Sequence, residues 1–154
     1  MTSVSPSGAT TSGGSGLWCS PPDLPADTRL KRLVDRVLPR NGLGAFVFFV
    51  LVAVAISFAD LFPTRLHLGV VGLASALAGG WCAVNFWRCR HAHCVVTGAG
   101  WLALAAFVAV EVVIGRSVIG GTEELVFLGV LAVSVLFELG VYAVRGTHAL
   151  TREG

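Results

Sequence analysis

The sequence predicts an all-α membrane protein: a bundle of four transmembrane helices with an N-terminal amphipathic interfacial helix. Two observations support this fold class. Of the 154 residues, 55% are hydrophobic and only 13% are charged, a composition too apolar for an ordinary water-soluble domain. The apolar residues form four continuous runs, each near the roughly 20 residues that a helix needs to cross a bilayer. Continuous rather than alternating hydrophobicity favours helices over the strands of a membrane barrel.

The first 40 residues divide into two segments. Residues 1–26 are rich in Ser, Gly, Thr and Pro, and we expect a disordered tail there because they have little apolar surface to bury. In residues 27–40 the apolar side chains recur at helical spacing, at Leu30, Leu33, Val34, Val37 and Leu38. The basic residues on the other side are Arg29, Lys31, Arg32 and Arg36. This pattern predicts a basic amphipathic helix that lies on anionic lipid headgroups.

The transmembrane domain is predicted over residues 43–144, with spans at residues 43–62, 66–87, 95–114 and 125–144. Lys and Arg are concentrated in the N-terminal segment, in the connection between the second and third spans, and in the C-terminal tail at 145–154. The other two connections carry one arginine each, Arg65 and Arg116. Because cytoplasmic loops carry the excess of positive charge, we expect a multi-pass protein of the inner (plasma) membrane with both termini in the cytoplasm.

A repeat of small residues marks the second span. Gly72, Ala76 and Gly80 follow one another every four residues, which places them on one face of a helix. Such a face allows another helix to approach closely and favours helix contact over lipid contact. The neighbour is expected either within the chain or in a homo-oligomer or larger membrane complex.

The connection between the second and third spans gathers metal-ligating side chains. The candidates are Cys89, His91, His93 and Cys94, with Cys82 about 10 Å deeper in the second span because it lies about two helical turns before Cys89. Thiols stay reduced in the cytoplasm, so these cysteines are more typical of metal binding than of a structural disulfide. Soft ligands of this kind select Cu(I), Hg(II) or Zn(II), and their close spacing favours an open site suited to transfer.

Glu138 is predicted to lie inside the fourth span, at a depth similar to that of Cys82. An ionisable residue inside a span usually faces the bundle interior and has a partner. The candidate partners are Arg88, Arg145 or an ion in transit. We therefore expect an intramembrane acid directly below the cysteine and histidine ligands.

This architecture resembles the small inner-membrane mercury-resistance transporters of bacteria, and the residues that carry the resemblance are Cys82, Cys89 and Cys94. The resemblance implies uptake of a thiophilic ion through the bundle and its delivery to a cytosolic acceptor.

Two other functions stay open. The chain is alternatively a non-catalytic scaffold or subunit of a larger complex, docked by its basic helix and its small-residue face. A further alternative is a membrane thiol–disulfide redox protein in which Cys89 and Cys94 form the active pair. Phosphate-binding loops, nucleophile elbows and paired catalytic carboxylates are absent from the sequence, and the net charge of +2 does not indicate nucleic-acid binding. An enzymatic role is therefore the less favoured expectation.

Overall fold

The computed structural model describes residues 42–89 and 91–146, although the side chains of Gly42 and of residues 87–89 are not part of that description. This part of the chain is all-helical, with four helices and no strand, which confirms the all-α part of the predicted fold class. Its helices are α2 (Gly42–Ala59), α3 (Thr64–Cys89), α4 (Ala92–Ile114) and α5 (Glu123–Arg145). The predicted tail at 1–26, the amphipathic helix at 27–40 and most of the C-terminal tail lie outside the described residues.

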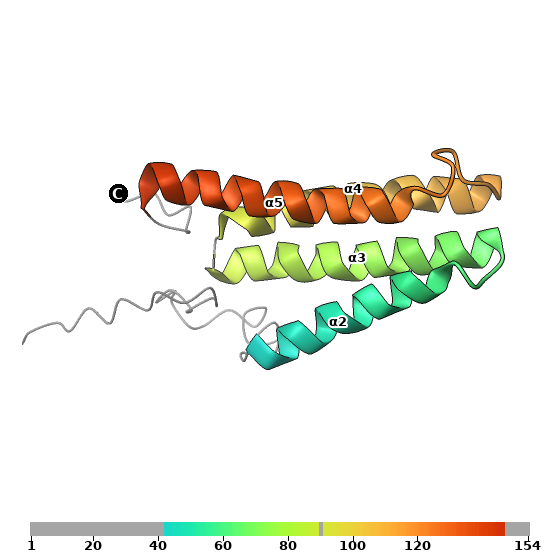
Figure 1. Cartoon of the computed structure of the whole chain (residues 1–154), viewed down its shortest axis with the longest axis horizontal. Helices are drawn as coiled ribbons and strands as arrows, with labels where there is room; N and C mark the ends of the chain where they lie inside the picture. The colour runs from blue at the N-terminus through green and yellow to red at the C-terminus, as the bar shows by residue number, and fades with distance from the viewer. Residues whose placement is uncertain (1–41, 90, 147–154) are drawn as a thin grey trace, which may run out of the picture.

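The helices run alternately up and down the bundle, with α3, α4 and α5 nearly aligned and α2 crossing α3 at an incline (Figure 1). The closest pair is α3 with α4, while α5 packs mainly on α4 and α2 mainly on α3. We call the end at which α3 turns into α4 the hairpin end. The opposite end, with the connections at residues 60–63 and 115–122, is the loop end.

Three of the helices are long and apolar enough to span a membrane: Thr64–Phe86 within α3, Ala92–Ile114 and Glu123–Arg145, each of 23 residues. A helix of that length extends about 34 Å, slightly more than a hydrocarbon core. The apolar part of α2, Leu43–Ala59, is shorter. Many large apolar side chains on these helices are exposed, as expected of surfaces that contact lipid.

The helix ends follow local sequence signals. Pro63 immediately precedes α3, and its carbonyl accepts hydrogen bonds from the amides of Leu66 and His67 in the first turn. At the other ends, Gly115 and Gly146 adopt left-handed conformations with φ of 78° and 67° and terminate α4 and α5. The first turn of α5 is acidic and its last turn contains Arg145, which complements the helix dipole.

The connection between α3 and α4 is shorter than predicted. Cys89 is the last residue of α3, and α4 already begins at Ala92, so His93 and Cys94 lie in the first turn of a helix. The prediction of a loop that contains both cysteines and both histidines is therefore wrong. The reason is that two antiparallel helices can close within two residues when their facing side chains are small, and α3 packs closely on α4.

The expected small-residue face is only partly the contact face. A Cβ at Gly72 would lie 3.2 Å from the Val108 side chain, so this glycine does face α4. Ala76 is exposed, and a Cβ at Gly80 would meet nothing within 4 Å in the described structure. The close approach uses Gly79 instead, where a Cβ would lie 2.9 Å from the backbone nitrogen of Leu102. The packing face is therefore rotated by about one residue, or about 100°, from the predicted repeat.

The core lies where α4 meets its neighbours and is centred on Trp101. Its indole ring stacks on Phe127 of α5 with 4.6 Å between centroids, and its Nε1–H donates to the Phe127 carbonyl at 3.0 Å. On the other side, the ring centroid of Phe49 in α2 lies 5.9 Å away. Trp101 therefore connects three helices, and it separates the polar residues at the two ends of the bundle.

Candidate metal site

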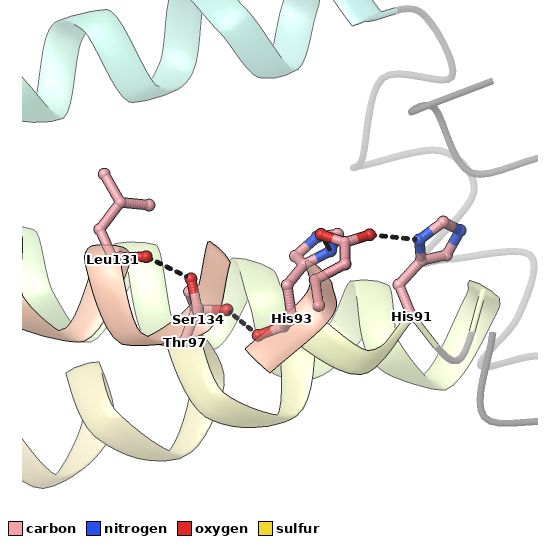
Figure 2. A network of polar contacts seen from close by, with 6 residues as sticks. His91, His93, Thr97, Leu131 and Ser134 are labelled. Carbon is pink, nitrogen blue, oxygen red and sulfur yellow. Dashed lines mark hydrogen bonds and ion pairs between the residues drawn. The ribbon is translucent and has the colours of Figure 1, made fainter. Parts of the chain in front are cut away.

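Two histidines and one acid meet at the hairpin end. His91 directly precedes α4 and His93 lies in its first turn, and Figure 2 shows the two imidazoles side by side. Glu138 lies in the C-terminal part of α5, and its carboxylate is close to both rings. The backbone of His91 is extended, with φ −68° and ψ 141°, and its side chain does not cap the helix. Its imidazole points toward Glu138 instead.

The Glu138 carboxylate is shared between the two rings. Its Oε1 lies 3.7 Å from Nδ1 of His91, and its Oε2 lies 2.8 Å from Nδ1 of His93. The two rings are edge to face, with centroids 5.5 Å apart. Although His93 and Glu138 are within ion-pair distance, the Nδ1 of His93 does not meet hydrogen-bond geometry with any acceptor in the described structure. The three groups are therefore close enough either to form an ion pair or to share a cation.

The site is largely shielded from solvent. The exposed fractions of the His91, His93 and Glu138 side chains are 11%, 30% and 15%, and both Nδ1 atoms are buried. Buried ionisable groups must be paired or bind a cation, because burial of an uncompensated charge is unfavourable. The partial exposure of His93 leaves one side of the site open to exchange with the surroundings.

The donor spacing fits a first-row transition metal. Three ligand atoms, one from each residue, lie within 4.8 Å of one another. With metal–ligand bonds of 2.0–2.2 Å, neighbouring donors lie about 2.9 Å apart in octahedral and about 3.4 Å apart in tetrahedral coordination. The observed contacts of 2.8 and 3.7 Å bracket these distances closely. Two imidazoles with one carboxylate form a recognised set for Zn(II) and for Fe(II), and three protein ligands leave an open coordination position.

Helix electrostatics favour the acid in this position. The carboxylate of Glu138 faces the N-terminal turn of α4, where the helix dipole stabilises negative charge. The same dipole disfavours the binding of a cation by the two imidazoles alone, unless an anion is also present. Glu138 is therefore the residue on which a bound cation depends most.

Polar hydroxyls continue from the site into the bundle. Thr97 donates to the carbonyl of His93 at 2.8 Å, and Ser134 donates to the carbonyl of Leu131 at 2.7 Å (Figure 2). Ser134 lies one turn before Glu138 on α5. Both hydroxyls return their hydrogen bonds to their own helices, so they position helical turns and do not offer a further ligand.

The structure places the predicted cysteines behind this site. Cys94 and Cys82 are both buried free thiols within electrostatic range of each other, and Cys94 is also within that range of Glu138. The Cys94 thiol contacts the Asn85 side chain, and the Cys82 thiol contacts the Thr97 hydroxyl. Neither thiol belongs to the set of converging donors. The side chain of Cys89 is outside what the structure describes.

The structure gives Glu138 two partners that were not predicted, the imidazoles of His91 and His93. Of the partners we expected, the Arg88 side chain lies outside the described residues, and Arg145 and an ion in transit stay predictions. Glu138 meets the start of α4 on the level of the two histidines, whereas we expected it below them, at a depth similar to that of Cys82. Had α4 been predicted to begin at Ala92, the histidines would have been placed on the level of Glu138 from sequence.

Neither a scan of protein-family models nor searches among curated proteins and solved structures finds a match to this chain. The functional argument therefore depends on the geometry of its own residues.

Proposed function

We propose that this chain is a multi-pass membrane protein that binds a transition-metal ion at the hairpin end and hands it to an acceptor. The observation that carries the proposal is the convergence of His91, His93 and Glu138 from two helices on one small volume. Three protein ligands with an open position suit an ion that must be released again. The proposal keeps the metal-handling function expected from the sequence and moves the principal ligands from thiols to imidazoles and a carboxylate.

The proposed topology has four spans and a cytoplasmic hairpin end. The 18 residues of α2 extend about 27 Å, near the thickness of a hydrocarbon core, and its apolar sequence continues through Leu61 and Phe62. The arginines near the connection of α3 to α4 favour the cytoplasm under the positive-inside rule. The metal site would then face the cytoplasm of a cell bounded by this inner membrane.

The donor set favours a borderline divalent ion, with Zn(II) as the first candidate. Imidazole and carboxylate ligands suit Zn(II) better than Cu(I) or Hg(II), which prefer thiolates. The buried thiol of Cys94 is within electrostatic range of Glu138 and of the Cys82 thiol, and these two thiols are the ligands that a thiophilic ion would need. Transport of Hg(II), as in the mercury-resistance transporters, is therefore the version of this proposal that uses the cysteines.

Metal titration of the tag-free full chain in lipid nanodiscs tests the proposal. We expect E138Q and H93Q to weaken Zn(II) binding at the hairpin end by at least about tenfold, because each removes a ligand. E138Q should have the larger effect, because it leaves two imidazoles at the positive end of α4 without an anion. S134A is the matched control: it alters α5 one turn from Glu138 and should bind as wild type.

If both E138Q and H93Q bind Zn(II) at every site as tightly as the wild-type chain does, the proposal is contradicted. A parallel titration with Hg(II) and C94S distinguishes the ion classes. If C94S no longer binds Hg(II) and the wild-type chain does not bind Zn(II), the transported ion is thiophilic and the thiols are its ligands.

A structural role for the same residues is the second candidate function, favoured by the 2.8 Å contact between His93 and Glu138. As an ion pair it would tie α4 to α5 within a scaffold. In that case H93Q and E138Q would lower the thermal stability of metal-free protein, and Zn(II) would stabilise wild type and variants equally.

A further inference from the structure

A second cluster of potential ligands lies at the loop end, on elements that the first site does not use. Asp60 follows α2, His67 lies in the first turn of α3, and Glu124 lies in the first turn of α5. One ligand atom from each of these residues lies within 4.8 Å of the others. The short connection of α2 to α3 and the distant first turn of α5 therefore bring an imidazole and two carboxylates together.

The spacing within the cluster fits metal coordination. Nδ1 of His67 lies 3.3 Å from Oδ1 of Asp60, too long for a good hydrogen bond. It is close to the separation of about 3.4 Å between two ligands of a tetrahedral ion. One imidazole with two carboxylates is a ligand set for Zn(II), and also for Mn(II) or Fe(II).

Buried atoms without partners provide the independent observation. His67 is only 9% exposed, and its Nε2 is buried without a hydrogen-bond partner in the described structure. The Oε1 of Glu124 is likewise buried without one. Groups of this kind are normally satisfied by protein, water or an ion. An ion beside Nδ1 of His67 would give the Oε1 of Glu124 a partner, whereas an ion pair between His67 and Asp60 alone leaves this oxygen without one. The Nε2 of His67 points away from Nδ1 and is not a ligand of the same ion.

The charge around the cluster favours a cation. Glu124 lies within electrostatic range of Asp60, His67 and Glu123, so acidic groups outnumber the imidazole here. Asp60 directly follows the C-terminus of α2, where the helix dipole disfavours an anion and favours a positive charge. Of the arginines at this end, Arg65 has its guanidinium over the backbone of Gly115, and Arg116 is exposed.

Nearby acids have structural partners and are not part of the cluster. Glu111 accepts a hydrogen bond from the Val118 amide, and Glu123 accepts one from the Ser117 hydroxyl. Both bonds hold the connection between α4 and α5. One oxygen of Glu111 and one of Glu123, their Oε2 atoms, are also buried without a partner, as is Oε1 of Glu124. Glu124 differs from them because it alone lies with Asp60 and His67 within 4.8 Å.

We infer that Asp60, His67 and Glu124 form a second divalent-cation site at the loop end, separate from the hairpin-end site. The ion it would take is a borderline transition-metal cation such as Zn(II). The two sites lie at opposite ends of the bundle (Figure 1), so cations would be bound near both membrane surfaces. This inference does not require the hairpin-end site, because the two sites share no residue.

Co(II) serves as the probe, since its visible absorption reports coordination by nitrogen and oxygen ligands. Tag-free full chain in nanodiscs is titrated with Co(II), and bound ions per chain are compared between variants. We expect H67Q to bind one Co(II) ion fewer than wild type, because the loop-end site is lost. H93Q should lose the ion at the hairpin end and keep the ion at the loop end. D60N should weaken the loop-end site by at least about tenfold.

Two carboxylate variants of α5 act as controls for each other: E124Q should affect only the loop-end site and E138Q only the hairpin-end site. Helicity is measured for each variant, and if H67Q loses it, D60N decides, because the Asp60 side chain is 69% exposed and tolerates substitution. If D60N, or a folded H67Q, binds Co(II) as wild type does, the inference is overturned. Failure of the proposed function would appear separately, as unchanged binding in H93Q and E138Q.

Discussion

At the scale of single residues, Trp101 shows how a polar atom is accommodated in the core of this bundle. Its indole is 1% exposed, it stacks on Phe127, and its N–H reaches the Phe127 carbonyl. In an environment without water, an unsatisfied N–H is costly, so the hydrogen bond is part of the condition for burying the ring. Its position also fixes the rotation of α5 relative to α4, which determines where Glu138 points.

Replacing Trp101 by phenylalanine keeps an aromatic ring against Phe127 and removes the hydrogen bond. We expect W101F to lower the free energy of unfolding by about 0.5–1.5 kcal/mol for the hydrogen bond, plus a contribution from the smaller ring. Denaturation in mixed micelles measures the change. W81F is the matched control, because Trp81 is only half-buried and stacks on Phe48 without a described hydrogen bond. If W101F and W81F lower the free energy of unfolding equally, the smaller ring alone explains the loss of stability.

At the scale of helices, the contact between α3 and α4 depends on two glycines that each face the backbone of the other helix. Without a hydrophobic driving force in lipid, helices associate through close packing, and small residues permit it. Gly79 supplies this approach, and Gly98 on α4 supplies another, where a Cβ would lie 3.3 Å from the backbone nitrogen of Ala83. These contacts hold the two helices together near the short hairpin and thereby position His91 and His93.

The adjacent glycines of α3 provide a matched pair of variants. In G79A the new Cβ would lie 2.9 Å from the Leu102 backbone, so the helices must separate. We expect a loss of stability of about 1–3 kcal/mol, the usual cost of overpacking. In G80A the Cβ would meet nothing within 4 Å, and better helix propensity should leave stability unchanged or slightly higher. Thermal unfolding of the two variants distinguishes them, and a stable G79A would contradict the packing described.

At the scale of the whole molecule, the bundle has polar clusters at its two ends and an apolar middle. His91, His93 and Glu138 lie at the hairpin end, and the cluster of Asp60, His67 and Glu124 lies at the loop end. The core between them is formed by residues such as Trp101 and Leu104. An antiparallel bundle that crosses a bilayer must place its two ends on opposite sides, so the two clusters would face different compartments.

Labelling from one side of the membrane tests this orientation. Leu61 at the loop end and Val144 at the hairpin end are 76% and 85% exposed, so a cysteine at either position should be reactive. In a background that lacks Cys19 and Cys89, we expect an impermeant maleimide to label L61C in intact cells and V144C only after lysis. The buried thiols of Cys82 and Cys94 should react in neither case. The reverse pattern would place the hairpin end outside.

Composition and hydrophobic runs were sufficient for the helical architecture and for the approximate bounds of α2 to α5, because an apolar segment in a bilayer must satisfy its backbone within a helix. They also sufficed to single out Glu138, His91 and His93 as unusual residues for this environment. Which of these residues meet depended on the rotation and register of the packed helices. This rotation is set by details such as the contact of Gly79, and not of Gly80, with Leu102 of α4. The Asp60, His67 and Glu124 cluster was not predicted for the same reason: Asp60 and His67 are seven residues apart, but only the packing of α5 brings Glu124 to them.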